Sequence, residues 1–186
     1  LAFWLSQQVD VSLNHPEKNV RETAEELVSL MTPVVKSFFT DMGTEITNEA
    51  IQVFGGYGYT KDQGIEQLYR DNRITPIYEG TNSVQAIDLV FRKVLNNKIL
   101  FKFVTLIKDE IKNDKNKTEL KKFSKILEHN LALLLEFTNW LEDKNKNNKD
   151  DVSSACNDFL KVLGYISLGY SWFKTTKVSL EKLSEN

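Results

Sequence analysis

Apolar residues recur every three or four positions over most of the chain, which is the spacing of amphipathic helices. Residues 1–13 follow this pattern until His15-Pro16 interrupts it. A longer pattern then predicts one extended helix with the apolar stripe Leu27, Leu30, Met31, Val34, Val35, Phe38, Phe39, Met42, Ile46, Ala50 and Ile51. Pro33 lies within the stripe, so the helix is either kinked there or restarts with Thr32 as its cap.

The long helix is predicted to end at the Gly-Gly-Tyr-Gly-Tyr sequence of residues 55–59, because glycines commonly follow the last turn of a helix. A short helix is expected over 65–72, and a turn over 75–80. Thr81 or Ser83 can then cap a further helix, which carries Val84, Ile87, Val90, Phe91, Val94 and Leu95.

The second half of the chain shows three more helical patterns, over 99–111, 118–141 and 152–183. Lys/Asn-rich stretches at 112–117 and 143–151 separate them, and we interpret both stretches as solvated loops. No segment alternates as a strand does. The sequence therefore predicts an all-α protein: a helical bundle over 1–97, incomplete at its N-terminus, followed by a helical extension over 98–186.

Composition excludes some classes of protein. The formal net charge of -2 gives no global positive field for nucleic acid or anionic lipid. A lone cysteine, Cys156, cannot form an intramolecular disulfide, which fits a reducing compartment such as the bacterial cytosol or a mitochondrial matrix. The residues around His129 lack the spacing of metal ligands. The chain begins with Leu1 inside a helical pattern, so we expect it to be part of a longer protein.

Two loops have the residue types of a binding site. Bare backbone N–H groups in the glycine cluster could approach an anionic group closely, and Gly80 leaves the Glu79 carboxylate accessible to a flat substrate. Thr81 begins the next helix, whose N-terminus also favours anions. A glycine cluster after a helix is more often a plain turn, however, and a glutamate in a loop is more often a solvated charge. These features alone leave the function open.

The combination of motifs is more specific. Residues 52–59 read QVFGGYGY, residues 66–74 read EQLYRDNRI and residues 77–85 read IYEGTNSVQ. In order and spacing they resemble the signature of the acyl-CoA dehydrogenase family. The sequences around His15-Pro16 and over 86–93 resemble the branch with a helical C-terminal extension, which includes 3-methylmercaptopropionyl-CoA dehydrogenase-like enzymes. Asn72 and Ser83 depart from the residues common in that family or branch.

The resemblance implies a flavoenzyme that oxidises the Cα–Cβ bond of an acyl-CoA to a trans-2-enoyl-CoA. A carboxylate removes the α-proton while flavin N5 accepts a hydride from Cβ. By position, Glu79 matches the catalytic base. Tyr78 and Gly80 match substrate-binding positions. The positions that match FAD contacts are Gln52, Gly55, Gly56, Thr81, Asn82 and Ser83. In the family, the first three usually serve the cofactor of the neighbouring subunit. Arg70 and Arg73 are more simply read as residues that tie two helices together.

The same resemblance implies partners: an acyl-CoA substrate, an electron-transfer flavoprotein as electron acceptor, and N-terminal and middle domains that this chain lacks. No metal and no nucleic acid are expected. We expect a homodimer in which residues 98–186 cover an apolar surface that relatives without the extension use to form tetramers. Two alternatives stay open, namely an acyl-CoA oxidase that passes electrons to oxygen and a helical assembly module without catalysis.

Overall fold

The computed structural model describes residues 1–113 and 118–184, and the described residues are almost entirely helical, with no strand among them. The all-α prediction is therefore confirmed. The elements in order are α1 (Ala2–Asn14), α2 (Lys18–Phe54), η1 (Gly55–Tyr59), η2 (Lys61–Gln63), α3 (Ile65–Asn72), α4 (Asn82–Ile87), η3 (Asp88–Asn96), α5 (Leu100–Asn113), α6 (Thr118–Asn147) and α7 (Lys149–Ser184). The elements η1 and η2 are 3₁₀ helices, whereas η3 has the wider turn of a π-helix.

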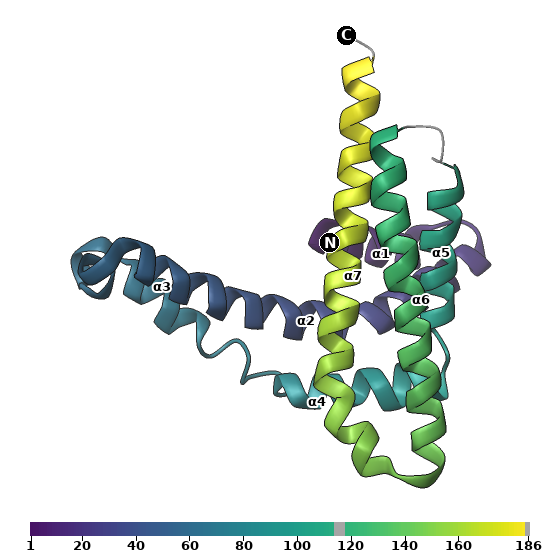
Figure 1. Ribbon diagram of the computed structural model, residues 1–186, viewed down its shortest axis with the longest axis horizontal. Helices are drawn as coiled ribbons and strands as arrows, with labels where there is room; N and C mark the ends of the chain where they lie inside the picture. Colours follow the sequence, from purple (N-terminus) through teal and green to yellow (C-terminus); the bar gives the residue numbers. More distant parts are fainter. Residues whose placement is uncertain (114–117, 185–186) are drawn as a thin grey trace.

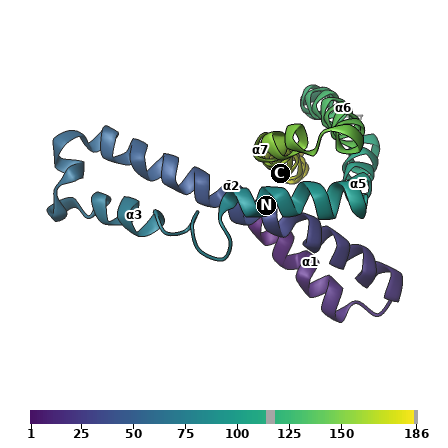
Figure 2. The same ribbon diagram turned by 90° about the horizontal axis from the view of Figure 1, so that it is seen from below.

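The helices form a body with a projecting arm (Figures 1 and 2). In the body, α6 and α7 make a long antiparallel pair that crosses α2, and α5 lies beside α6. The arm consists of the C-terminal half of α2 with α3 packed alongside it. Burial follows this division: most of the apolar stripe of α2 from Leu27 to Phe38 is buried, whereas Ile46 is 65% exposed.

Pro33 lies inside α2 without ending it, since the helix runs unbroken from Lys18 to Phe54. The alternative in which Thr32 caps a second helix is therefore wrong. The Thr32 hydroxyl instead donates to the Val28 carbonyl, 2.7 Å away, one turn back within the same helix. Pro33 is buried, as are Met31 before it and Val34 after it in the sequence, so this part of α2 lies in the core.

The extension shares one apolar core with the N-terminal helices. Trp4 of α1, Phe103 of α5 and Tyr170 of α7 meet as an aromatic cluster, with ring centroids 6.0 to 6.3 Å apart. Burial raises the pKa of the Tyr170 phenol, and the nearby Glu110 carboxylate raises it further. Among the described residues that phenol oxygen has no hydrogen-bond partner, and Lys174 pairs with Glu110 at 3.3 Å.

The helix α7 also packs closely against α2. Phe38 of α2 is 4% exposed, and its ring meets Tyr165 edge-on at 5.0 Å. Gly164 lies directly against the same ring: a β-carbon at this position would be 2.4 Å from Phe38 Cδ2. The absence of a side chain at Gly164 is what lets the two helices approach there.

The expectation of a loop over 143–151 is wrong. The helix α6 continues to Asn147 and α7 begins at Lys149, so only Asn148 lies between them. Asn148 makes the reversal by donating its backbone N–H to the Lys144 carbonyl and accepting from Asp150 N–H at its side chain. Lys144 also pairs with Asp151 at 3.2 Å. Of the other expected loop, residues 112 and 113 belong to α5, and 114–117 lie outside the described residues.

Candidate active site

The Glu79 loop connects α3 to α4. Its ends are joined by a hydrogen bond from Asn82 N–H to the Pro76 carbonyl, 3.2 Å long. Within the loop, Glu79 has φ 56° and Gly80 has φ 81°. Glycine adopts a positive φ without strain, but a glutamate there costs on the order of 1 kcal/mol or more. Surrounding contacts must therefore hold Glu79 in this conformation.

Two side chains, one from α4 and one from α2, donate hydrogen bonds to the backbone of the loop. Gln85 Nε2 donates to the Glu79 carbonyl at 2.9 Å, reaching back from α4. Lys36 Nζ donates to the Gly80 carbonyl at 2.7 Å and to Asn82 Oδ1 at 2.8 Å, reaching up from α2. Together these contacts fix the two positive-φ residues. The motif itself did not reveal Lys36, because its link to Gly80 spans 44 positions of sequence.

The side chain of Asn82 is already fully bonded within the protein. Its amide nitrogen donates to Asp41 Oδ1 at 2.7 Å and to Thr40 Oγ1 at 3.0 Å, while its oxygen accepts from Lys36. Of the three residues expected to contact FAD here, Asn82 thus fastens α4 to α2. Any contact it makes with a cofactor would come through its backbone.

Thr81 and Ser83 have more accessible hydroxyls. Thr81 is the N-cap of α4 and accepts from Val84 N–H at 3.4 Å, which decides between the two candidate caps. Ser83 accepts from Asn157 Nδ2 of α7, also at 3.4 Å. Ser83 is one of the positions that depart from the family pattern, and here it links the site loop to the extension.

The Glu79 carboxylate is exposed and has no hydrogen-bond or ion-pair partner among the described residues. The backbone N–H of Glu79 likewise has no acceptor there. Tyr78 beside it is 50% exposed. The described part of the chain therefore positions an unpaired carboxylate and a free N–H side by side, but does not enclose them.

The glycine turn lies at the far end of the arm, away from the body (Figures 1 and 2). Gly55 ends α2 with φ 62°, and its N–H donates to the Gln52 carbonyl. A β-carbon at Gly55 or Gly56 would meet nothing within 4 Å, so this backbone is open to an approaching group. Gly58 differs, because a β-carbon there would be 2.8 Å from the Ile51 carbonyl oxygen.

The structure keeps the two predicted site regions apart within one chain. The glycine turn is at the tip of the arm, whereas the Glu79 loop lies between α3 and α4 at the junction with the body. The tip is also apolar and exposed, with Val53 at 83% and Tyr57 at 75%. This separation is the arrangement expected if the turn of one subunit serves the site of another.

Asn72 holds α3 against α2 within the arm. Its Nδ2 donates to Thr44 Oγ1 at 2.8 Å, and its Oδ1 occupies the space where a β-carbon of Gly43 would lie. This second departure from the family pattern is therefore a packing contact between α3 and α2. Arg70 bonds Gln67 and lies 3.9 Å from Glu66, so its contacts stay within α3 and do not join two helices.

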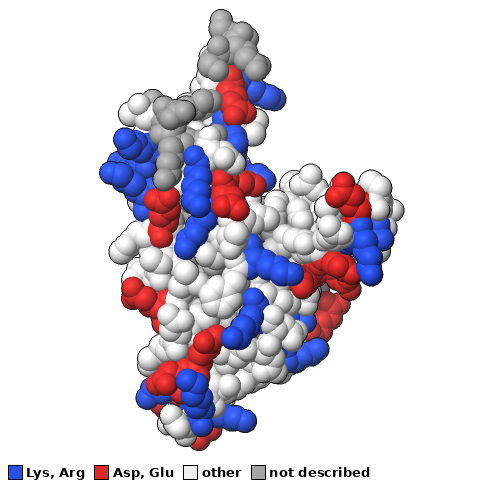
Figure 3. Space-filling model, turned by 90° about the vertical axis from the view of Figure 1, so that its right-hand side faces the viewer, with Lys and Arg blue, Asp and Glu red and all other residues white. Residues whose placement is uncertain are grey.

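The remaining surface offers no competing site of the classes considered above. Among residues 1–113 and 118–184 no cluster of His, Cys, Asp and Glu could hold a metal ion. In the same part of the chain no helix is long and apolar enough to cross a membrane. On the face seen in Figure 3, positive and negative side chains are interspersed, and neither sign dominates.

Two protein-family models match the chain. The model for "Acyl-CoA dehydrogenase, C-terminal domain" matches residues 17–94, which contain the arm and the Glu79 loop. A second model, "Acetyl-CoA dehydrogenase C-terminal like", matches residues 103–186. The chain belongs to the acyl-CoA dehydrogenase family.

Named relatives match about half of the chain. It is 40% identical over 97 residues to 3-methylmercaptopropionyl-CoA dehydrogenase of Ruegeria pomeroyi, covering 52% of this chain and 16% of that protein. It is 36% identical over 90 residues to butyryl-CoA dehydrogenase of Syntrophomonas wolfei, covering 48% and 15% respectively. The matched segments thus span about a sixth of these relatives.

Solved structures share the fold over most of the chain. The crystal structure of Caenorhabditis elegans ACDH-11 in complex with C11-CoA superimposes with a TM-score of 0.74 at 23% identity, covering 90% of this chain and 29% of that one. The structure named Bd2924 apo-form gives a TM-score of 0.59 at 20% identity, covering 91% and 30%. Both alignments include the extension as well as the arm.

Proposed function

We propose that the chain is the C-terminal catalytic part of an FAD-dependent acyl-CoA dehydrogenase, with Glu79 as the base that removes the α-proton of an acyl-CoA thioester. The observation that carries the proposal is the clamped loop. Glu79 has a left-handed backbone held by Gln85 and Lys36, and its carboxylate is left unpaired. Backbone strain of this kind is concentrated at functional sites, where surrounding contacts hold it.

The geometry of the loop supports a role for each of its residues. The Glu79 carboxylate is the proton acceptor. Gly80 allows the positive φ of the loop and makes room for Gln85, whose Nε2 would be 3.3 Å from a β-carbon at this position. The free N–H of Glu79 can donate to the thioester carbonyl oxygen and so stabilise negative charge that develops as the proton leaves. Tyr78, which is half exposed beside Glu79 in the sequence, is the proposed substrate contact.

The residues present fit a flavin at the expected positions. The open backbone of Gly55 and Gly56 admits close approach of a large planar or anionic group, and Gln52 lies one turn before it. Thr81 and Ser83 supply hydroxyls at the start of α4. FAD, when bound, supplies the hydride acceptor. The chain contributes the contacts that hold it and the base that works beside it.

The proposal extends to the missing partners. N-terminal and middle domains of the same protein would enclose Glu79 and complete the flavin site. The arm would carry its glycine turn to the site of a neighbouring subunit, for which a homodimer is the smallest assembly. An electron-transfer flavoprotein is the proposed electron acceptor. The boundary between bundle and extension is placed after residue 97, where Lys98 has φ 53° between η3 and α5.

The test is Glu79→Gln in the full-length protein, with Glu49→Gln as the control. Both residues are exposed, and both substitutions remove one negative charge at nearly constant shape. Glu79→Gln is expected to retain bound FAD and to lose about three orders of magnitude in the rate of acyl-CoA oxidation, since it removes a positioned base. Glu49→Gln is expected to keep the rate. Near-normal turnover of Glu79→Gln would refute the assignment.

A further inference from the structure

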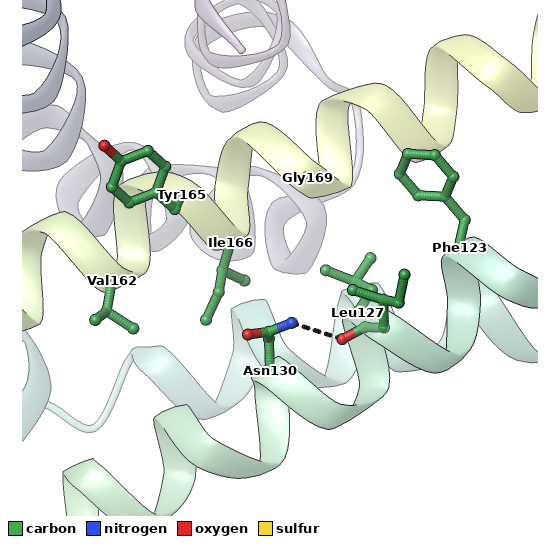
Figure 4. A pocket seen from close by; sticks show the side chains of 8 residues that line it. Phe123, Leu127, Asn130, Val162, Tyr165, Ile166 and Gly169 are labelled. Carbon is green, nitrogen blue, oxygen red and sulfur yellow. Dashed lines mark hydrogen bonds between the residues drawn. The ribbon is translucent and has the colours of Figure 1, made fainter.

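An apolar groove and the Glu79 loop differ in their polar contacts. The groove, of about 380 Å³, lies between α6 and α7 (Figure 4), and the amide that lines it, Asn130, already donates to the Ile126 carbonyl within α6. The Glu79 loop instead accepts directed hydrogen bonds from two other elements, and one of its donors is the Lys36 ammonium. Lys36 is therefore placed to determine where the proposed base lies.

Lys36 is carried by the buried half of α2. Its neighbours Ser37 and Phe38 are 1% and 4% exposed, so the backbone that carries it belongs to the core. The Lys36 side chain is partly buried, and no carboxylate among the described residues forms an ion pair with it. Its ammonium instead donates to the Gly80 carbonyl at 2.7 Å and to Asn82 Oδ1 at 2.8 Å. Hydrogen bonds from a charged donor are about twice as strong as neutral ones, so Lys36 fixes the loop to a rigid helix.

The two acceptors of Lys36 connect the base to the proposed flavin contacts. Gly80 follows the base directly, and Asn82 lies between Thr81 and Ser83, whose hydroxyls are among those proposed contacts. The amide nitrogen of the same Asn82 side chain is bonded to α2 as well. One ammonium thus links the residue next to the base to the segment that would hold the flavin.

The loop needs an external contact to keep its shape. Glu79 has φ 56°, which is strained for a residue with a side chain, and Gly80 beside it has little conformational preference of its own. A return of Glu79 to negative φ would turn its carboxylate in another direction. Gln85 bonds the Glu79 carbonyl, but it belongs to α4, the helix into which the loop leads, so this bond closes the loop locally. Of these two donors, only Lys36 reaches the loop from 44 positions away and fixes it relative to the core.

We propose that Lys36 is a positioning residue for acyl-CoA oxidation, which holds the Glu79 carboxylate and the flavin contacts in a fixed relative position. This role rests on the proposed function of Glu79 as the base. The α-proton passes to Glu79 and the β-hydride to the flavin, so one substrate must meet the base and the flavin at the same time. Lys36 acts through the Gly80 carbonyl and the Asn82 side chain, and takes no proton itself. A misplacement of the base by about 1 Å is expected to lower the rate about 100-fold.

Lys36→Met in the full-length protein removes both bonds at nearly constant side-chain length. It is expected to lower kcat about 10- to 100-fold, to leave KM within about threefold and to retain bound FAD. The matched control is Lys93→Met, because Lys93 Nζ also joins another element to α2, donating to Ser29 Oγ at 2.7 Å, but its partner lies outside the loop. This control should keep kcat within about twofold. Should Lys36→Met lose helix content by circular dichroism, Lys36→Gln, which is too short to reach both acceptors, carries the same expectations.

Two readouts separate positioning from a loss of stability. With a substrate deuterated at Cα, the isotope effect on kcat should rise in Lys36→Met, because a misplaced base makes proton transfer slower. A smaller fraction of folded enzyme would leave that isotope effect unchanged. Hydrogen–deuterium exchange followed by mass spectrometry needs no turnover. It should become faster over residues 76–82, where Asn82 N–H is bonded to the Pro76 carbonyl, and stay unchanged there in Lys93→Met.

A double variant tests whether Lys36 acts through Glu79. In Glu79→Gln, adding Lys36→Met should lower the remaining rate less than about twofold, because residues that act as one unit are not additive. A further loss as large as in the unmodified protein would overturn the proposal. So would a normal kcat in Lys36→Met, a loss no larger than in Lys93→Met, or a loss of rate with both readouts unchanged. Normal turnover of Glu79→Gln alone is a different result, which refutes the proposed function itself.

Discussion

Gly164→Ala measures how tightly the extension is held against α2. An alanine β-carbon at this position would lie 2.4 Å from Phe38 Cδ2, 2.7 Å from Cγ and 3.0 Å from Cε2. Carbon atoms pack best at about 3.5 to 4.0 Å, so the ring would have to move by more than about 1 Å. Phe38 is 4% exposed and packed edge-on against Tyr165, so no free space receives it.

Two opposing effects determine how much Gly164→Ala changes the free energy of unfolding. Replacing glycine by alanine inside a helix stabilises it by about 1 kcal/mol. Overpacking a core costs about 1 to 3 kcal/mol, and an overlap of more than about 1 Å belongs near the upper end of that range. The net expectation is a loss of about 2 kcal/mol in the free energy of unfolding, which corresponds to a fall in Tm of about 4 to 8 °C for a chain of this size.

Gly169 provides a matched control on the same helix. A β-carbon there would meet only Leu127 Cδ1, at 3.9 Å, which is an ordinary contact. Gly169→Ala should therefore stabilise the chain by about 0.5 to 1 kcal/mol through helix propensity alone. Thermal and urea unfolding, monitored by circular dichroism, give the change in free energy of unfolding for both variants. The double variant Phe38→Leu/Gly164→Ala should recover part of the loss, since the two sites are in contact. If Gly164→Ala were as stable as Gly169→Ala, the close approach of α2 and α7 would be wrong.

Two other predictions concern the glycine turn and the cysteine. In the full-length protein, Gly56→Val should lower the amount of bound flavin. The helix content should stay unchanged, because a β-carbon at this position meets nothing in the chain itself. Full retention of FAD would mean that the turn is only a helix end. Burial raises the pKa of the Cys156 thiol from 9.0 to about 11, so a thiol reagent at pH 8 should modify it only as the chain unfolds. Because the unfolded thiol ionises first, stability should also fall as pH rises from about 9 to 11, and Cys156→Ala should remove that part of the pH dependence. Rapid labelling of the folded chain at pH 8 would contradict the buried position.

The sequence by itself determined the helical class, the short helix over 65–72 and the two loops of the site. These features depend on local signals: apolar spacing for the helices, and glycine and the Thr81 cap for the ends. The family motifs placed Glu79 and the glycine turn in the same way, because the motif residues lie close together in sequence. The roles of the site residues remain predictions, since no ligand contact establishes them.

Only the tertiary structure decided what holds the site and what the helices leave exposed. The bond from Lys36 to Gly80, the fit of Asn72 against Gly43 and the contact of Gly164 with Phe38 each join distant parts of the chain, so no local pattern contains them. The Lys/Asn-rich segment after residue 142 became helical because Asn148 alone completes the turn and the Lys144–Asp151 pair bridges the two helices. Four large apolar side chains of α6, Phe123, Ile126, Leu133 and Trp140, are 37% to 57% exposed, because α7 and α5 cover only one side of that helix.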